Sequence, residues 1–459
     1  MIIGSGSAAF AAAIELAEAG RQVVMVERSP IIGGTCVNVG CVPSKIMIRQ
    51  AEVAHLQAQP PFASITACAS QVDHAARVGE LRAKVEALRE QKYHHMLEIY
   101  PQISLRQGEA RLRDAHTVEI DGPEGRETVN AGHILIATGS RPHVPDLPGL
   151  NETPFWTSTE LLFAEEPPEH LLVLGAGVVA LELAQAAARL GSRVTLIARR
   201  RLLSHLPPEV DETLRAALAE EGIEVITGSP RRVDYAAGHF TVEMESHQLI
   251  GDRLLVATGR VANTDGLNLA EGGVRTDEHG AIEVNEHMQT NVPGIYAAGD
   301  CTTLPRFVYV AAAGGKTAAR HMLGDCCARQ DLAVLPQVVF TDPQVATVGL
   351  TVEQAAAQGI EADSRRLPLE QMPRAQAQGS RHGFVQLVAE RGGGRLLGAQ
   401  IVAPQAGEMI EAAALALRAG MTVRDLAGEL MPYLTWAEGL KLCAQTFFKD
   451  VSRLSCCAG

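Results

Sequence analysis

The sequence predicts an α/β protein in which two similar strand–helix–strand units are followed by a C-terminal α+β domain. The motif G-x-G-x-x-A occurs twice, beginning at Gly4 and at Gly175, and each copy stands between a short apolar strand and an Ala-rich helix. From about residue 333 the pattern changes to strands followed by helices, which we expect around 407–419 and 423–430. The length of 459 residues allows about three domains at roughly 150 residues each.

Composition and charge exclude several classes of protein. The chain is 46% hydrophobic, so it can bury enough apolar surface to fold. Every apolar run is broken by Gly, Pro or charge well before the length of a bilayer span, and we expect no membrane insertion. The net charge of −13 disfavours a nucleic-acid partner. Nine cysteines and no secretory-type start predict a cytoplasmic protein whose reactive thiols are catalytic.

The first unit has the residues of a dinucleotide site. Gly4 allows a tight turn after the first strand, Gly6 lets the backbone approach a pyrophosphate, and Ala9 packs the helix against the strand. The helix N-terminus then faces the phosphate charge. The next strand, 22–27, ends in Glu27, whose carboxylate can accept hydrogen bonds from a ribose.

The second unit repeats this plan with one difference. Gly175, Gly177 and Ala180 follow the strand 171–174, which predicts a second Rossmann-like dinucleotide-binding domain. The strand 193–198 ends without an acidic residue and is followed by Arg199, Arg200 and Arg201. Guanidinium groups in place of a carboxylate favour a ribose 2′-phosphate, and hence NADPH. A solvated basic turn is the alternative interpretation.

A pair of cysteines follows the first motif. Cys36 and Cys41 are five residues apart with glycines beside both, so they could form a small disulfide at the start of a helix. A helix N-terminus lowers the pKa of a thiol, and the thiolate is the nucleophile and the soft-metal ligand. The alternatives are packed structural cysteines or half of a zinc site, although no second Cys or His pair lies nearby.

The segment 33–45 resembles the redox-active segment of the flavin-dependent pyridine nucleotide–disulfide oxidoreductases. The resemblance extends over the full chain, through 137–139, 257–260 and 299–300. It implies FAD in the first unit, NAD(P)H in the second and a homodimer held by the C-terminal domain. It also implies the domain bounds. The FAD-binding domain is formed by 1–147 and 263–332, the NAD(P)H-binding domain by 148–262, and the dimerisation domain by 333–459.

The resemblance also implies roles for individual residues. Cys41 would contact the flavin, Cys36 would meet the substrate, and Lys45 with Glu182 would form an ion pair where hydride arrives. The residues implied at FAD are Gly4, Gly6, Ala9, Glu27, Gly34, Thr35, Lys45, Thr138, Gly139 and Asp300. Those implied at NADPH are Gly175, Gly177, Ala180, Arg199, Arg200 and Gly259.

Two features near the C-terminus indicate the substrate. Disulfide-reducing members of the family have a His-Pro-Thr-x-x-Glu run with a basic His, and here Tyr433 stands in place of that His. A phenol with a pKa near 10 cannot shuttle a thiol proton at neutral pH, so a disulfide substrate is disfavoured. Cys456 and Cys457 are adjacent on a short polar tail and can bind one soft cation, unless their pairing is accidental.

Together, Tyr433 and this tail resemble the mercury-reducing members of the family. The resemblance implies NADPH-dependent reduction of Hg(II) bis-thiolates to Hg(0), with Hg(II) passed from Cys456 and Cys457 to the inner cysteines. Those members have Tyr where this chain has Phe155, so one of two phenols expected near the metal is absent. The alternatives are a dihydrolipoamide- or glutathione-type disulfide reductase, and a non-catalytic thiol protein that sequesters metal.

The remaining cysteines have structural interpretations. Cys326 and Cys327 lie in a polar stretch, which predicts a surface loop with adventitious metal binding at most. Cys443 fits the apolar face of a helix, and Cys301 is expected to be buried near the flavin without a redox role.

Overall fold

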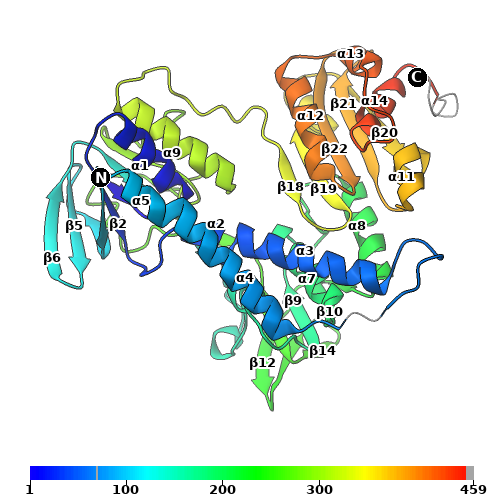
Figure 1. Ribbon diagram of the computed structural model, residues 1–459, viewed down its shortest axis with the longest axis horizontal. Coiled ribbons are helices and arrows are strands. Elements are labelled where there is room, and N and C mark those ends of the chain that lie inside the picture. Colours follow the sequence, from blue (N-terminus) through cyan, green and yellow to red (C-terminus); the bar gives the residue numbers. More distant parts are fainter. Residues whose placement is uncertain (69–70, 451–459) are drawn as a thin grey trace.

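The computed structural model describes residues 1–68 and 71–450 (Figure 1). Figure 1 shows an elongated molecule, with the N-terminal sheet at one end and the C-terminal domain at the other. The second nucleotide unit lies beside the C-terminal domain, below it in Figure 1. The mixed α/β architecture agrees with the fold class predicted from the sequence.

The first sheet is parallel and combines strands from distant parts of the chain, in the order β17-β7-β1-β2-β3. Two helices, α1 and α9, lie side by side against it (Figure 1). These elements are β1 (Ile2–Ile3), α1 (Ser7–Glu18), β2 (Val23–Glu27), β3 (Ile103–Gln107), β7 (Ile134–Ile136), β17 (Ile295–Ala297) and α9 (Val308–Met322). An antiparallel sheet and a two-stranded ribbon adjoin it, formed by β4 (Glu109–Leu112), β5 (Thr117–Gly122), β6 (Gly125–Asn130), β8 (Ser140–Pro142) and β16 (Arg260–Ala262).

The second sheet has the parallel order β11-β10-β9-β15, and an antiparallel sheet packs beside it. Its helix α7 is apolar on the side that faces the strands, because its alanines and leucines are buried there. The elements are α6 (Ser158–Leu162), β9 (His170–Leu174), α7 (Val178–Arg189), β10 (Arg193–Ala198), α8 (Pro208–Glu220), β11 (Glu224–Thr227), β12 (Arg232–Ala236), β13 (His239–Glu243), β14 (Gln248–Gly251) and β15 (Arg253–Val256).

The C-terminal domain is built on an antiparallel sheet with the order β18-β19-β22-β21-β20. Strand β22 is buried along its whole length, so both faces of the sheet are covered. The elements are β18 (Gln337–Val339), β19 (Gln344–Gly349), α10 (Val352–Ala357), β20 (Ala362–Pro368), α11 (Pro373–Gln378), β21 (Phe384–Glu390), β22 (Leu396–Ala403), α12 (Ala406–Arg418), α13 (Val423–Gly428) and α14 (Glu438–Gln445). Short 3₁₀ turns occur at 150–152 and 369–371.

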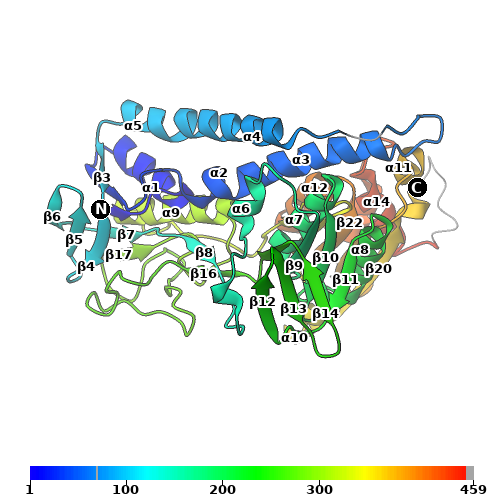
Figure 2. The same ribbon diagram turned by 90° about the horizontal axis from the view of Figure 1, so that it is seen from below.

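Three helical segments run along one side of the molecule and connect its parts (Figure 2). They are α2 (Gly34–Val39), α3 (Cys41–Ala58) and α4 (His74–Arg89), and α4 continues through a π-helical turn, η1 (Glu90–His94), into α5 (His95–Ile99). Helix α3 packs against α7 of the second unit, so the segment with the cysteine pair bridges the two nucleotide units.

The elements expected from the sequence are present with small shifts at their ends. The strand expected at 193–198 has those bounds, and the helix expected at 407–419 is α12. The helix expected at 423–430 stops at Gly428, because the backbone at Glu429 is extended. Among the described residues, no helix combines the length and apolar character needed to cross a bilayer.

Candidate active site

A cavity of about 920 Å³ opens between the first sheet, α3, α7 and the start of the C-terminal domain. Both inner cysteines line it, as do Lys45 and Glu182. Of the residues that the sequence predicts at FAD, all except Ala9 line this cavity, namely Gly4, Gly6, Glu27, Gly34, Thr35, Lys45, Thr138, Gly139 and Asp300. The residues predicted at NADPH do not line it, although Val178, Glu182 and His205 of the second unit do.

The turn after β1 requires glycine and directs a helix N-terminus at the cavity. Gly4 has φ +111°, and a Cβ there would lie 2.4 Å from the carbonyl oxygen of Ala137. Helix α1 begins after Gly6, which has no side chain to cap the free N–H groups. Ala9 is fully buried under the turn, and Gly34 approaches Gly6 so closely that a Cβ would lie 2.7 Å from its Cα. The backbone N–H groups therefore face open space that an anion can fill.

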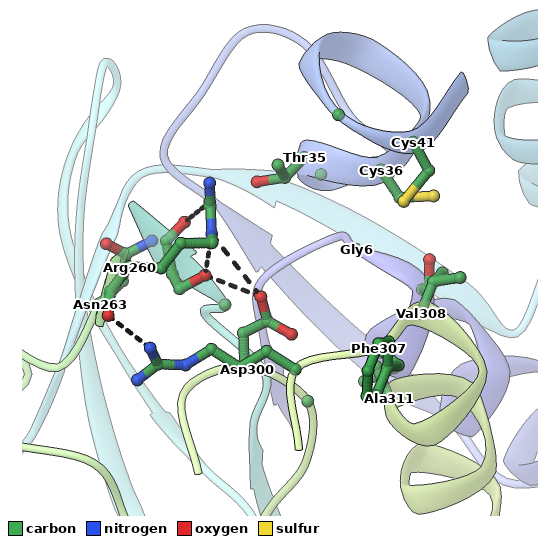
Figure 3. A pocket seen from close by; sticks show the side chains of 18 of the residues that line it. Gly6, Thr35, Cys36, Cys41, Arg260, Asn263, Asp300, Phe307, Val308 and Ala311 are labelled. Atoms are coloured by element: carbon green, nitrogen blue, oxygen red, sulfur yellow. Dashed lines mark hydrogen bonds and ion pairs between the residues drawn. The ribbon is translucent and has the colours of Figure 1, made fainter. Parts of the chain in front are cut away.

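Carboxylates mark two sides of the cavity. Glu27 ends β2, where it accepts hydrogen bonds from the hydroxyl of Ser5 (2.7 Å) and the backbone N–H of Ser29 (2.8 Å). Asp300 accepts a hydrogen bond from the Ser140 hydroxyl (2.7 Å), and Arg260 Nε lies 3.9 Å from the same carboxylate (Figure 3). Both carboxylates retain oxygen lone pairs for a polar ligand.

The second turn has the same construction. Gly175 has φ +138°, and a Cβ there would lie 2.3 Å from the carbonyl oxygen of Ala257. Helix α7 begins after Gly177, and Ala180 is fully buried beneath the turn. Gly259 also has a positive φ of +119° in the neighbouring loop.

The basic residues after β10 are accessible to a ligand. Arg199 and Arg200 directly follow the strand and are exposed at the edge where the parallel strands end. Their positions agree with the place where a dinucleotide ribose lies in such folds, since ligands bind at the carboxyl ends of the strands.

The two inner cysteines meet where α2 ends and α3 begins. Cys36 lies in α2 and Cys41 is the first residue of α3, with their sulfur atoms side by side (Figure 3). A Cβ at Gly40 would lie 2.9 Å from the carbonyl oxygen of Thr35, so glycine lets the two helices join this closely.

The two inner thiols have pKa values shifted in opposite directions. A hydrogen bond from Cys36 stabilises the thiolate of Cys41, and together with the Lys45 ammonium it lowers the pKa of Cys41 to about 7 against the opposing effect of burial. The same hydrogen bond and burial raise the pKa of Cys36. About half of the Cys41 thiols are therefore ionised at neutral pH, beside a protonated Cys36.

An ion pair joins the cysteine helix to the second unit. Lys45 Nζ lies 2.7 Å from Glu182 on α7, and Glu182 is only 4% exposed. The other carboxylate oxygen of Glu182 accepts the backbone N–H of Phe340 (2.9 Å), whose ring also lies 4.6 Å below the Lys45 ammonium. The first unit, the second unit and the C-terminal domain thus each contribute a residue that holds this ion pair in the cavity.

Two tyrosines at the site were not predicted from the sequence. Tyr309 lines the cavity, and the phenol of Tyr93 is close enough for the charges of Cys36 and Cys41 to act on it. The Tyr93 ring packs edge-on against Phe10 at 4.9 Å, and its hydroxyl is hydrogen-bonded to Ser7. Burial raises the pKa of Tyr93, and the nearby charges of Cys36 and Cys41 add to this shift. Tyr93 lies in the π-helical turn η1, a rare feature that often occurs at functional sites, but the sequence gives no local signal for it.

The expectation that a phenol near the metal is missing at position 155, where the chain has Phe155, stays a prediction. Phe155 packs in the apolar core of the second unit, beside residues such as Leu150 and Phe240, and does not line the cavity. A phenylalanine suits that environment because no hydroxyl needs a partner there.

One predicted functional residue lies away from this cavity, and two others cannot be placed in it. Tyr433 precedes α14 in the C-terminal domain, is half exposed and does not line the cavity within a single chain. Thr435 in the same run caps the next turn, accepting the backbone N–H of Glu438 (3.3 Å). Cys456 and Cys457 lie outside the described residues.

The other cysteines are placed as the sequence predicted. Cys301 and Cys443 are fully buried, where burial raises the pKa of each thiol, to about 11 and about 12. Their thiols donate to backbone carbonyls, so they are structural. Cys326 and Cys327 are exposed after α9.

Comparison with known proteins agrees with this geometry. Residues 1–315 match the family model "Pyridine nucleotide-disulphide oxidoreductase", and residues 335–444 match its dimerisation domain. Mercuric reductases from Shewanella putrefaciens and Shigella flexneri are 54% and 50% identical over 100% of this chain and 82% of theirs.

Solved structures show the same arrangement. The Cu(II) complex of the HOCl-induced flavoprotein disulfide reductase RclA from Escherichia coli has a TM-score of 0.88 and 28% identity, over 97% of this chain and 98% of that one. LpdA from Mycobacterium tuberculosis has a TM-score of 0.87 and 27% identity, over 98% and 99% of the two chains. The two nucleotide turns, the cysteine pair between them and a match over the whole chain lead to one conclusion: the chain belongs to the pyridine nucleotide–disulphide oxidoreductase family.

Proposed function

We propose that this protein uses NADPH and FAD to reduce Hg(II) bis-thiolates to Hg(0). The observation that carries the proposal is the hydrogen-bonded Cys36–Cys41 pair beside the Lys45–Glu182 ion pair, at the junction of two dinucleotide turns. The relatives that cover the whole chain at 43–54% identity are named mercuric reductases, which supports Hg(II) as the substrate.

The residues that line the cavity fit FAD. The Gly4–Gly6 turn leaves helix N–H groups free for a diphosphate, Glu27 can hold a ribose, and Asp300 can hold the ribityl chain. The cavity volume of about 920 Å³ is large enough for a dinucleotide. When bound, FAD supplies a two-electron carrier between NADPH and the thiols.

The cysteine pair would bind the metal. Cys36, on the substrate side, displaces one small thiol and gives up its proton to it. Cys41, on the flavin side, displaces the other as thiolate, because its pKa is lowered to about 7. Two thiolates then hold Hg(II) in the linear geometry that this soft ion favours. The exchange needs no general base, which agrees with Tyr433 in place of the family's His.

The Lys45–Glu182 ion pair would balance the buried negative charge beside the cysteines. Glu182 is buried, and Lys45 compensates its charge while stabilising the Cys41 thiolate. We propose the roles of positioning residue for Glu182 and of thiolate partner for Lys45.

The C-terminal residues would act on the partner subunit. The dimerisation domain indicates a homodimer. We propose that Tyr433 of one subunit completes the metal site of the other, and that Cys456 and Cys457 collect Hg(II) from small-thiol complexes and deliver it there. We accordingly propose that residues 1–147 and 263–332 form the FAD-binding domain and residues 148–262 the NADPH-binding domain. Residues 333–459 would serve dimerisation and metal delivery.

The overall reaction balances as Hg(SR)₂ + NADPH + H⁺ giving Hg(0), NADP⁺ and two RSH. Two electrons pass from NADPH to the metal, and the released thiolates take up the protons. Because reduced thiols and NADPH are both plentiful in the cytoplasm, we propose that compartment as its place of action.

Steady-state NADPH oxidation with different acceptors tests the proposal. The holoenzyme should oxidise NADPH with HgCl₂ in excess small thiol, and only slowly with oxidised glutathione or oxidised lipoamide. Faster turnover of either disulfide would favour a disulfide reductase. A purified protein without flavin absorbance and without turnover would favour metal sequestration instead.

A further inference from the structure

The vicinal cysteines Cys326 and Cys327 have no part in the proposed reaction. They lie after α9, in the segment that runs along the edge of the molecule before β18 (Figure 1), and both are exposed. Among the described cysteines outside the cavity, the others are single thiols, Cys68 at the surface and Cys301 and Cys443 in the interior.

Hydrogen bonds hold the turn that carries this pair. The carboxylate of Asp325 accepts the backbone N–H of Cys327 (3.0 Å), and its carbonyl accepts the N–H of Ala328 (3.1 Å). Two residues further on, Gln330 donates its N–H to the carbonyl of Glu286 (2.8 Å). The turn is thus fixed at both ends before any ligand binds.

The two thiols already face each other. The Cys327 thiol is hydrogen-bonded to Cys326, and this bond raises the pKa of Cys327. A disulfide between them is disfavoured, because consecutive Cα atoms are about 3.8 Å apart whereas disulfides span about 4.4–6.8 Å. The pair therefore persists as two neighbouring thiols at the surface.

The number of available ligands limits the kind of metal. No group of three or more His, Cys, Asp or Glu side chains suited to a metal exists among residues 1–68 and 71–450. Structural Zn²⁺ needs four ligands and hard cations need more. Two thiolates alone suit a soft ion with linear coordination, such as Hg(II).

We propose that Cys326 and Cys327 form a second Hg(II)-binding site, which holds the metal outside the redox cavity. The two thiols displace two small thiolates from Hg(SR)₂, their protons leave with the released RSH, and no electrons are transferred. The choice of Hg(II) rests on the proposed function, whereas the thiol pair and its coordination number do not.

Distance separates this site from the chemistry. Helix α9 has 15 residues and is about 22 Å long at 1.5 Å per residue. Its first turn lines the cavity through Val308 and Ala311, and the cysteine pair follows its opposite end. Metal held at the pair is out of reach of the electrons delivered in the cavity, so the site holds Hg(II) without reducing it.

Mercury retention without reductant tests the proposal. The holoenzyme is dialysed to equilibrium against HgCl₂ in excess glutathione without NADPH, and mercury per subunit is measured by atomic absorption. We expect the wild type to retain one more Hg(II) per subunit than the double variant Cys326→Ser with Cys327→Ser. Each single variant should lose the same equivalent, because glutathione displaces metal from a lone thiol whereas a chelating pair has an effective concentration in the millimolar range.

The control is Cys68→Ser, which removes a single exposed thiol and should retain mercury like the wild type. NADPH-driven Hg(II) turnover should be the same in all these variants. Equal retention by wild type and double variant would overturn the proposal, and so would a parallel loss of turnover, which would place the pair on the delivery route. Loss of turnover in every protein, including wild type, would count against the proposed function alone.

Discussion

The reactivity of Cys41 depends on two neighbours that come from its own segment. Cys36 donates the hydrogen bond that most lowers the pKa of Cys41, and Lys45, one helical turn further on, adds its charge. Tyr93 approaches the pair from a distant helix. The local sequence motif thus determines the lowered pKa of Cys41, while the position of the Tyr93 phenol depends on tertiary packing.

The pH dependence of alkylation should report the Cys41 thiolate. In the reduced holoenzyme, the iodoacetamide reaction should have a midpoint near pH 7 and fall about tenfold per unit below it, because only the thiolate reacts. Cys36→Ala should move the midpoint toward the ordinary thiol value of about 9, since the donor is lost. Cys68→Ser is the control. An unchanged midpoint in Cys36→Ala would contradict the hydrogen-bond account.

Coenzyme preference should depend on Arg199 and Arg200. Changing both to Gln should lower kcat/KM for NADPH roughly ten- to hundredfold, which corresponds to about 1.5–3 kcal/mol for a charge-assisted phosphate contact. The value for NADH should hardly change, because it has no 2′-phosphate. Arg193→Gln, at the opposite end of β10, is the matched control. Equal losses with both coenzymes would mean that the basic turn is only a solvated surface.

At the scale of the elements, the two nucleotide turns could be predicted because each is a local motif. The conformations of Gly4 and Gly175 and the burial of Ala9 and Ala180 match the roles read from the sequence. Tyr93 could not be predicted, because its position depends on a π-helical turn and on a helix returning over the first sheet.

Two glycines of the second turn should respond differently to alanine. Gly175→Ala should destabilise the fold by about 2 kcal/mol or more, because φ is +138° and the Cβ would meet a backbone carbonyl. Gly177→Ala should leave stability unchanged, since its φ is −89° and its Cβ meets nothing within 4 Å, but should weaken NADPH binding where the pyrophosphate approaches. Thermal unfolding and NADPH titration separate the two effects. Equal melting temperatures would contradict the steric argument.

At the scale of the whole molecule, we propose that each active site is built from residues of two subunits. The cavity of a single chain lacks Tyr433, and we propose that this residue and the tail cysteines serve the cavity of the partner subunit. The fold class was predictable because it follows from the order of the motifs. The assembly of this site across two subunits stays a prediction, because no contact within one chain tests it.

Removal of both tail thiols should change which Hg(II) complexes the enzyme reduces efficiently. Cys456→Ala with Cys457→Ala should keep FAD content, but turnover of Hg(II) with two glutathiones should fall sharply while turnover with bromide falls much less. Mixed dimers of this variant with Cys41→Ser should recover about half of wild-type activity, because one intact site forms across the subunits. Equal turnover across both ligand types would show that the tail has no delivery role.

The central claim is that electrons from NADPH reach Hg(II) through the Cys36–Cys41 site. The most direct measurement counts volatile Hg(0) released per NADPH oxidised, by wild type and by Cys41→Ser, at equal FAD content. The account predicts a one-to-one ratio for the wild type and no Hg(0) from Cys41→Ser, although this variant should still bind NADPH. Mercury vapour from Cys41→Ser at the wild-type rate, or NADPH oxidation without Hg(0) in the wild type, would contradict it.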